Sequence, residues 1–203
     1  QFDKELEDTH TLASVLNEAG YATAVIGKWG LGGTSAPYNA HPHNRGFDYF
    51  FGVMEHGEAH AHYLPEAGHD LFDGTSTVSA GFEKCYSTDL FTARAKKWIS
   101  DHHTANPTQP FFLYLAYTAP HARLQVPTQA YPSGSGQTGG LQWVGTPGNM
   151  INTASGTIDS WIHPDFASTG WPVAAQRHAT MVRRLDTAVG DLIDLLDDLG
   201  VGD

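Results

Sequence analysis

The chain has little cysteine, little basic charge and no long hydrophobic run. Cys85 is the only cysteine in 203 residues, so neither an intrachain disulfide nor a cysteine-rich zinc site is possible. Lys and Arg number 11 against 22 Asp and Glu, and the formal charge of −11 argues against a general nucleic-acid or anionic-membrane binder. No run of about 18 apolar residues occurs, so no transmembrane helix is predicted. A few local cations could still hold a small anionic substrate against this overall charge.

The two ends of the sequence carry no visible targeting signal. The chain opens QFDKELED, with neither the basic start nor the apolar segment of a signal peptide, and without an initiator Met. It closes on LGVGD directly after a predicted helix, where a further strand would be expected. We therefore expect an internal piece of a longer protein.

Hydrophobic periodicity predicts helices that alternate with buried strands. Helical spacing of apolar residues predicts helices over 9–20, 87–103 and 174–199. Short apolar runs over 21–27 and 111–117 predict strands buried on both faces, as in a parallel sheet. Helix, strand, helix, strand, helix is typical of a sheet covered by helices. We predict an α/β fold with a mostly parallel sheet and helices on both faces.

The last of these helices is long and amphipathic. Its apolar stripe follows the 3.6-residue period and is expected to face the core: Val182, Leu185, Val189, Leu192, Leu196 and Leu199. Arg183 and Arg184, with Asp186 nearby, are expected on the solvated face.

Two long segments lack sustained periodicity. Residues 30–80 are rich in Gly, His, Pro and Asn and predict a loop region with short strands near Phe72 and Val78. Residues 128–175 carry many Gly, Ser, Thr and Pro, and such a loop in a compact domain is usually functional or mobile. Tryptophans in this second segment could stack on sugar rings or anchor the loop: Trp143, Trp161 and Trp171. No internal repeat is visible, and we expect a single domain.

Polar side chains follow both predicted strands. Lys28 comes directly after the first strand, and His121 follows the second after Thr118-Ala119-Pro120. Ligands bind beyond the carboxyl ends of the strands in an open parallel sheet, so both side chains would emerge on one rim. Lys supplies a compact fixed charge and His can protonate a leaving oxygen, which suits phosphate and sulfate esters. The alternative is a solvated lysine at a strand end and a hydrogen-bonded loop histidine.

Four blocks of the sequence, in this order, resemble the sulfatase family of the alkaline-phosphatase-like fold. They are TLASVLNEAGYATAVIGKWGLGG, NRGFDYFFG, PFFLYLAYTAPHARLQVP and HATMVRRLDTAVGDLIDLLDDLG. Together they are specific, where GKW alone would be weak. The resemblance implies hydrolysis of sulfate esters by a formylglycine nucleophile made from Cys or Ser, with a divalent cation, usually calcium, beside it.

The resemblance implies roles for both rim residues. Lys28 matches the lysine of the family's G-K-W-H-L-G segment, which implies contact with the sulfate and with the formylglycine. His121 matches the histidine of the A-P-H segment, which implies contact with the ester and assistance to the leaving group. Gly30 departs from the pattern, which commonly has a histidine there. Either another residue supplies that role, or the chemistry is tuned differently.

The family's nucleophile and metal segments are not found in this sequence. The nucleophile lies in C/S-x-P-S/A-R, whereas Cys85 is followed by Tyr-Ser-Thr-Asp. The paired aspartates of the family's start and its later D-N-G segment are also missing. We therefore expect residues 1–203 to be the central part of a single, incomplete sulfatase catalytic domain. Formylglycine and Ca²⁺ ligands would come from outside this chain, which would be inactive alone.

The sequence holds 12 histidines, among which HAH at His60 and His62 stands out. On a strand both rings would share one side, and they could begin a zinc or copper site with His56 as the nearest further ligand. Loop histidines that line a pocket or face solvent are the simpler interpretation. The resemblance places this loop near the active-site mouth, which implies substrate contact by His60 or His62. Arg123 is either a second cation for a sulfated or carboxylated substrate or a surface arginine.

We predict a sulfuric ester hydrolase whose parent protein cleaves sulfate esters of carbohydrates or aryl groups. The alternatives are a phosphate or phosphonate ester hydrolase of the same superfamily and a non-catalytic relative that binds sulfated glycans. A C/S-x-P-x-R motif upstream of Gln1 would favour the enzyme, and its absence the binder. The expected partner is a small-molecule or glycan sulfate ester, with no nucleic acid and no membrane. The resemblance implies a periplasmic or secreted protein.

Overall fold

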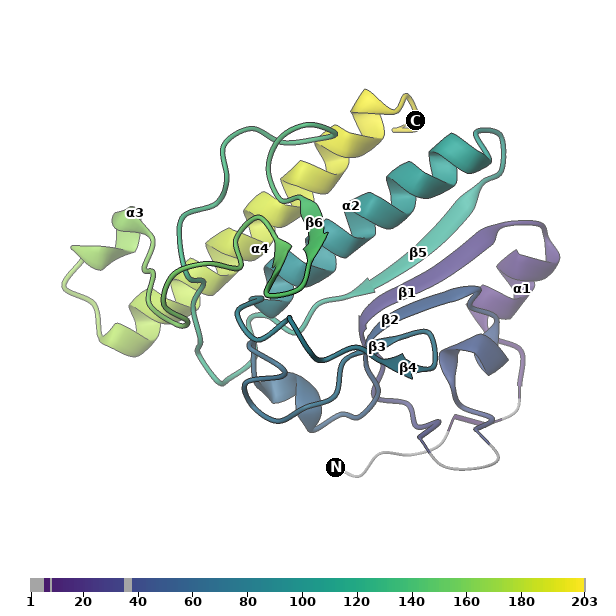
Figure 1. Cartoon of the computed structure of the whole chain (residues 1–203), viewed down its shortest axis with the longest axis horizontal. Helices are drawn as coiled ribbons and strands as arrows, with labels where there is room; N and C mark the ends of the chain where they lie inside the picture. The colour runs from purple at the N-terminus through teal and green to yellow at the C-terminus, as the bar shows by residue number, and fades with distance from the viewer. Residues whose placement is uncertain (1–5, 8, 35–37, 203) are drawn as a thin grey trace.

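A central sheet with helices packed against it forms the part of the chain that the computed structural model describes, residues 6–7, 9–34 and 38–202 (Figure 1). The helices are α1 (Leu12–Glu18), η1 (Pro42–Arg45), η2 (Glu58–His60), α2 (Ser87–Ala105), α3 (Pro164–Ala167) and α4 (Val173–Asp198). The strands are β1 (Ala22–Lys28), β2 (Tyr49–Val53), β3 (Phe72–Asp73), β4 (Ser76–Thr77), β5 (Phe111–Ala116), β6 (Trp143–Thr146) and β7 (Asn149–Ile151). The predicted helices and strands are all present.

The main sheet has five strands in the order β4-β3-β2-β1-β5. β1 pairs in parallel with β2 on one side and with β5 on the other, and the three strands run side by side in Figure 1. β3 and β4 add a short antiparallel edge. The predicted parallel sheet is therefore confirmed for its centre, and the short strands expected near Phe72 and Val78 form its edge.

The side chains of the central strands alternate between two apolar layers. Val25 and Phe50 pack with Ala13 of α1 on one face of the sheet. Ile26 and Phe51, the next residues along each strand, pack with α2 on the other face. All four strand side chains are fully buried. Helices thus cover both faces, as predicted.

β2 was not predicted, although it lies in the middle of the sheet. Its apolar run is only five residues long and contains a glycine, so it lacks the longer apolar pattern that predicts a strand.

Gly27 of β1 shows why glycine occurs inside these strands. A Cβ at Gly27, whose φ is +119°, would lie 2.1 Å from the carbonyl oxygen of Ala116 in β5. The neighbouring backbones approach too closely for any side chain.

β5 differs from the prediction of a strand buried on both faces. Its residues are half-buried, and Tyr114 is 47% exposed. Among the described residues β5 pairs with β1 alone, so its other edge carries no strand of this part of the chain. An apolar run cannot show from sequence whether a strand is central or at an edge.

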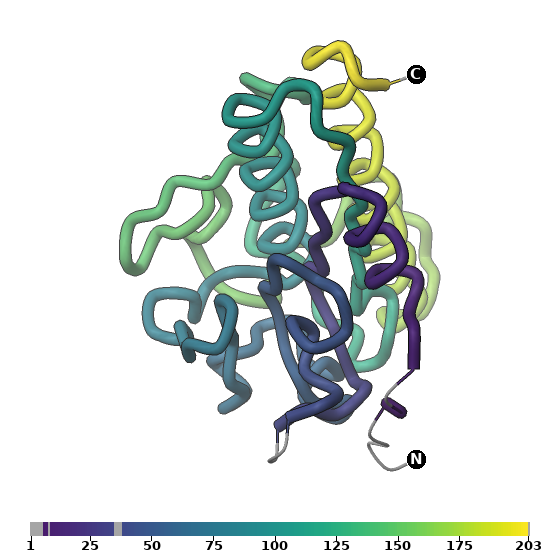
Figure 2. Tube along the Cα trace, turned by 90° about the vertical axis from the view of Figure 1, so that its right-hand side faces the viewer, coloured from purple at the N-terminus to yellow at the C-terminus, as the bar shows by residue number. Residues whose placement is uncertain are grey.

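α4 packs along α2 on the side away from the sheet, and both views show the two helices side by side (Figures 1 and 2). The residues that α4 buries are Thr180, Met181, Arg184, Ala188, Asp191 and Leu195. The predicted apolar stripe therefore lies one residue off the buried face, and Val182 and Val189 are each 43% exposed. Arg184, expected in solvent, is buried in a two-pronged ion pair with Asp89 of α2, at 2.7 and 2.6 Å. Arg183 is exposed as predicted.

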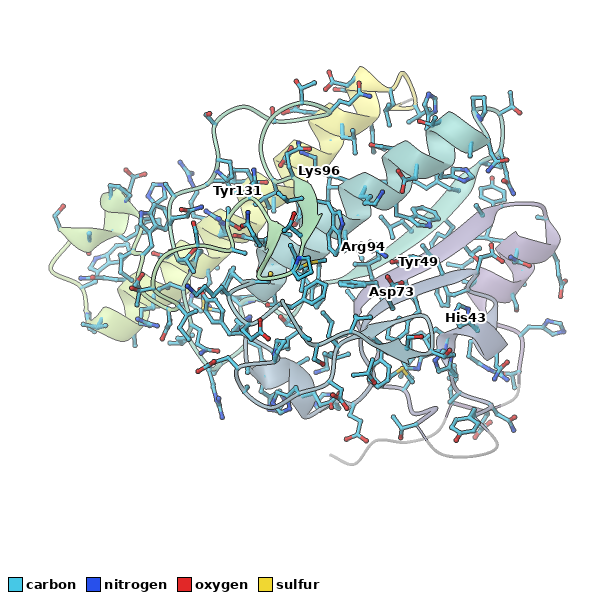
Figure 3. All side chains as sticks on the ribbon, in the orientation of Figure 1. His43, Tyr49, Asp73, Arg94, Lys96 and Tyr131 are labelled. Atoms are coloured by element: carbon cyan, nitrogen blue, oxygen red, sulfur yellow. The ribbon has the colours of Figure 1, made fainter. Side chains whose placement is uncertain are left out.

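Asp191 of α4 fixes the long loop that precedes β6. Its carboxylate accepts hydrogen bonds from the Tyr131 hydroxyl at 2.6 Å and from the Leu141 amide at 2.8 Å. It also forms a buried ion pair with Lys96 of α2 at 2.6 Å. Figure 3 labels Lys96 and Tyr131, the two side chains that bond to this carboxylate. The loop is therefore held by one buried carboxylate and not by apolar packing alone.

Arg94 of α2 ties the helix to the sheet edge and to the β6-β7 hairpin. Its guanidinium pairs with Asp73 of β3 and donates to the Tyr49 hydroxyl of β2; the three residues are labelled near one another in Figure 3. The same group lies 4.5 Å from the ring centroid of Trp143. Trp143 also packs edge-on against Phe51. These contacts favour the interpretation of Trp143 as a loop anchor.

Candidate functional site

Lys28 and His121 lie at the carboxyl ends of neighbouring parallel strands. Lys28 is the last residue of β1 and is half-buried. β5, which pairs in parallel with β1, ends at Ala116. The chain then turns, with the His121 amide donating to the Thr118 carbonyl at 3.0 Å, and His121 is exposed. The structure therefore places both predicted residues on the same rim.

His60 brings a third segment to this rim from η2. Its ring stacks on the His121 ring, with centroids 4.4 Å apart and planes 10° apart. The His56 ring meets the His60 ring edge-on, with the two centroids 5.4 Å apart. The amide of Arg123 donates to the His60 carbonyl at 2.9 Å, which joins the loop after β5 to η2.

The charges around His60 have one sign. Burial lowers the pKa of His60, and the positive charges of His121, Lys28, His56 and Arg123 lower it further. We call these five residues the basic cluster. Because they repel one another's positive charge, an anion bound among them would be favoured electrostatically. The cluster sits at the position where an open parallel sheet binds its ligands.

The Nε2 atom of His60 is buried. This atom has almost no accessible surface and no hydrogen-bond partner among the described residues. His121 stacks over the same ring. A substrate contact by His60, predicted from its position in the loop, would have to use the other edge of the ring.

His62 lies behind the rim and not on it. Its side chain has no exposed surface, and both ring nitrogens are in hydrogen bonds. Burial is the largest cause that lowers its pKa. The HAH segment is not a strand, because His60 ends η2, and so the two rings do not share one side. His62 is therefore not positioned to touch substrate as predicted: it is buried, and its ring bonds to the main chain of His121.

Gly30 lies beside Lys28 and His56. A Cβ at position 30 would be 3.5 Å from Cε of Lys28 and 3.8 Å from Cβ of His56. Its φ of +68° favours glycine. Both distances are ordinary van der Waals contacts, so the positive φ and not a lack of space is what favours glycine here. From the sequence His56 was predicted only as a possible further metal ligand, and no local pattern signals its position beside Gly30 and His60.

The described residues do not contain a metal site or an activated cysteine. No group of three or more His, Cys, Asp or Glu side chains within residues 6–7, 9–34 and 38–202 could hold a metal ion. A zinc or copper site built on His60 and His62 thus has no support. Burial raises the pKa of the Cys85 thiol to about 12, which removes the thiolate that a nucleophile needs.

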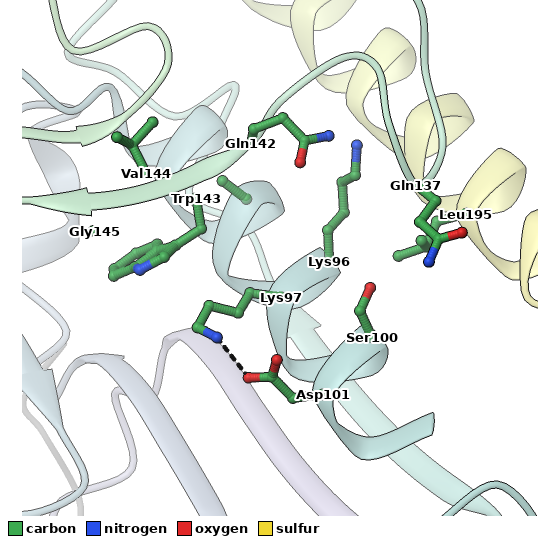
Figure 4. A pocket seen from close by; sticks show the side chains of 11 residues that line it. Lys96, Lys97, Ser100, Asp101, Gln137, Gln142, Trp143, Val144, Gly145 and Leu195 are labelled. Atoms are coloured by element: carbon green, nitrogen blue, oxygen red, sulfur yellow. Dashed lines mark hydrogen bonds and ion pairs between the residues drawn. The ribbon is translucent and has the colours of Figure 1, made fainter. Parts of the chain in front are cut away.

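A cavity of about 520 Å³ lies elsewhere, between α2 and the segment that leads into β6 (Figure 4). Its lining includes Lys97, Ser100, Gln137, Gln142 and Trp143. Figure 4 shows the Lys97–Asp101 ion pair at its wall. No residue of the basic cluster lines this cavity. The candidate site is therefore identified by the residues of the rim and not by this cavity.

Comparison with known proteins identifies the family. The sulfatase family profile matches residues 3–203. The chain belongs to the sulfatase family. Among curated proteins it is 37% identical over 125 residues to arylsulfatase J of Mus musculus, covering 59% of this chain and 20% of the relative. It is 34% identical over 125 residues to an arylsulfatase of Klebsiella aerogenes, covering 59% of this chain and 25% of the relative.

Solved structures share the fold of this sulfatase chain. Ps i-CgsB in complex with k-i-k-neocarrahexaose aligns with a TM-score of 0.65 and 23% identity, covering 99% of this chain and 41% of that one. A protein solved with D-glucosamine-2-N,6-O-disulfate aligns with a TM-score of 0.57 and 17% identity, covering 98% and 49%. The chain thus spans less than half the length of these proteins. Within its described part no helix is long and apolar enough to cross a membrane.

Proposed function

We propose that the protein containing this sulfatase chain hydrolyses sulfate esters at the rim formed by Lys28 and His121. The observation that carries this proposal is the meeting of both residues beyond the carboxyl ends of adjacent parallel strands, in a chain of the sulfatase family. The basic cluster around them suits a tetrahedral anion. Family membership favours sulfate over phosphate.

Each group of the rim has a task that follows from its chemistry. Lys28 offers a compact positive charge to the sulfate oxygens. His121 is exposed and can donate a proton to the ester oxygen as the bond to sulfur breaks. We assign to Arg123, also exposed, contact with a sulfate or carboxylate group of the substrate. His60 supports this arrangement by stacking on His121.

The nucleophile and the metal of the proposed reaction are expected from outside this chain. Formylglycine and Ca²⁺ are the groups that the family resemblance implies. The residues described here fit neither group, because Cys85 is buried and protonated and no metal-binding cluster is formed by the described side chains. We therefore assign no step through either group to these residues.

We propose sulfated carbohydrates or aryl sulfates as the substrates, and a periplasmic or secreted location for the whole protein. Two structural neighbours were solved with saccharides, one of them a disulfated glucosamine. Sulfate groups attached to sugars fit a rim that combines the fixed positive charges of Lys and Arg with imidazole groups that can donate hydrogen bonds. Fractionation of cells that produce the full-length protein tests the location.

The decisive experiment compares matched esters with the full-length protein. Turnover of nitrocatechol sulfate and of a sulfated disaccharide should exceed turnover of the corresponding phosphate esters. Faster phosphate turnover would assign the rim to a phosphate ester hydrolase. Binding of the sulfated disaccharide without any turnover would assign it to a glycan-binding relative.

A further inference from the structure

His62 occupies the centre of a buried hydrogen-bond network beneath the turn that carries His121. Its Nε2 lies 3.0 Å from the carbonyl oxygen of His121, which can only accept, so Nε2 carries a proton and donates. The ring has no exposed surface. One atom of the rim's main chain is therefore held directly by a buried imidazole.

The other ring nitrogen of His62 faces two hydroxyl groups. Nδ1 lies 3.0 Å from Oγ of Ser87 and 3.3 Å from Oγ1 of Thr118. The two hydroxyls are themselves 3.0 Å apart. A neutral ring with its proton on Nε2 has a free lone pair on Nδ1, so it can accept from one of these hydroxyls. The arrangement thus matches one tautomer of neutral histidine.

Main-chain bonds of His62 complete the link between two elements. The Ser87 amide, at the first residue of α2, donates to the His62 carbonyl at 2.8 Å. The His62 amide donates to Oε1 of Gln125 at 2.8 Å. The segment 118–125 is therefore attached to His62 at three points, before, at and after His121. His62 also bonds to Ser87 at the start of α2, a helix of 19 residues, and so connects the segment to that helix.

We propose that His62 is a positioning residue for His121. The neutral His62 ring fixes the segment 118–125 on the start of α2, and this places the His121 ring against His60 at the rim. His62 touches neither substrate nor reacting atoms, and it acts on the reaction through His121. This inference rests on the proposed function, because the assistance of His121 to the leaving group is itself part of that proposal.

Neutrality of His62 is consistent with its surroundings. Burial lowers its pKa and so does the charge of His121, while hydrogen bonding to the His121 carbonyl and the charge of Asp159 act in the opposite direction. The ring also packs against Tyr86, 5.7 Å between centroids. Protonation of Nδ1 would remove the acceptor that the two hydroxyls share. The network then loses the bond that defines its geometry.

Kinetics of the full-length protein on two sulfate esters test the proposal. One ester has a good leaving group, an aryl sulfate, and the other a poor one, an alkyl sulfate. His62→Ala should lower kcat on the alkyl sulfate about 10-fold more than on the aryl sulfate, with KM nearly unchanged, because proton donation contributes most to poor leaving groups. His62→Gln, which keeps a donor and an acceptor, should recover part of this loss.

A double-mutant cycle separates positioning from general destabilisation. In a His121→Ala background, His62→Ala should change the alkyl-to-aryl ratio less than twofold, because the group it positions is gone. His41→Ala removes another buried histidine, which packs against Phe50 and is not part of the basic cluster, and should leave that ratio unchanged. Equal losses on both esters, or a full further loss in the His121→Ala background, would overturn the proposal.

Two further measurements keep the proposal testable under other outcomes. Thr118→Val and Ser87→Ala remove one hydroxyl each and should shift the ratio in the same direction if His62→Ala does not fold. A crystal structure of the folded His62 variant should show the His60–His121 stack broken. A stack retained at its present 4.4 Å would overturn the positioning role, whether or not the protein cleaves sulfate esters.

Discussion

The interface between α2 and α4 and the rim at the carboxyl ends of β1 and β5 use charge in opposite ways. At the interface each buried charge has a partner of opposite sign, Arg184 with Asp89 and Lys96 with Asp191. At the rim the positive charges of His121, Lys28, His56 and Arg123 add to burial in lowering the pKa of His60. One region balances its charges within the fold, and the other gathers charge of one sign where a ligand can reach it.

This difference separates residues that hold the fold from residues that handle substrate. Both side chains of the Arg184–Asp89 pair are 1% exposed, and the pair joins helices from distant parts of the sequence. Removing one partner there leaves a buried charge without its match. Changing a rim residue alters the affinity for an anion while the packed layers stay intact. The two regions should therefore respond differently to single substitutions.

The largest expected effect is on stability at the α2–α4 interface. Arg184→Met should lower the free energy of unfolding by about 3–5 kcal/mol, because Asp89 stays buried and charged without its partner. Arg183→Met changes the exposed neighbour and should stay within about 0.5 kcal/mol of the wild type. Urea unfolding of the full-length variants measures both. Similar losses for the two arginines would contradict the distinction.

The next effect is on catalysis at the rim. Lys28→Met should lower kcat/KM for a sulfate ester about 100-fold in the full-length protein, since a preorganised charge on the reacting group is lost. Its unfolding free energy should remain near that of the wild type, because Lys28 is only half-buried. Lys97→Met, in an exposed ion pair on α2, is the matched control and should leave turnover unchanged. Unchanged turnover by Lys28→Met would remove this residue from the site.

A smaller effect is expected at Gly30, which lies beside the rim with a positive φ. Gly30→Ala and Gly170→Ala both place a Cβ at positive φ, +68° and +73°, and each should lower stability by about 1 kcal/mol. A Cβ at Gly170 has no neighbour within 4 Å, whereas one at Gly30 would contact Cε of Lys28 at 3.5 Å and Cβ of His56 at 3.8 Å. Only the Gly30 variant should therefore also raise KM for the sulfate ester. Equal KM values for the two variants would show that this space does not matter.

The smallest effect is a dependence of stability on pH. The pKa values of His60 and His62 are lowered in the folded state, mainly by burial. As the pH falls below about 6.5, the unfolded chain takes up protons at these positions before the folded chain does. The contribution of these two histidines to the free energy of unfolding is therefore fully present above this pH and is lost as the pH falls below it. Urea unfolding at pH 7.5 and 5.5 should show a smaller decline for His62→Gln than for the wild type, and an equal decline would exclude His62 as a source.

The rim could be predicted from the sequence because its signals are local. Each apolar run ends next to the residue that matters, Lys28 after β1 and His121 shortly after β5. Parallel pairing then brings the two ends together without any knowledge of side-chain packing. β2 could not be predicted in the same way, because five residues with a glycine give no distinct period.

The α2–α4 interface could not be predicted, because its contacts join residues far apart in sequence. Arg184 and Asp89 are 95 positions apart, and nearby Asp186 made a solvated face the simpler expectation. The apolar stripe of α4 was placed one residue away from its buried face for the same reason. His62 was assigned to substrate because the family resemblance places its loop near the active-site mouth. Its contacts with Ser87 and His121, which are distant in sequence, could not be predicted.

The most direct test of the central claim is the effect of His121→Ala on two sulfate esters of different leaving-group strength. If His121 protonates the departing oxygen at the rim, kcat of the full-length enzyme should fall far more for an alkyl sulfate than for an aryl sulfate, by about 100-fold against a few-fold. An equal loss on both esters would contradict the assignment of His121 to the leaving group.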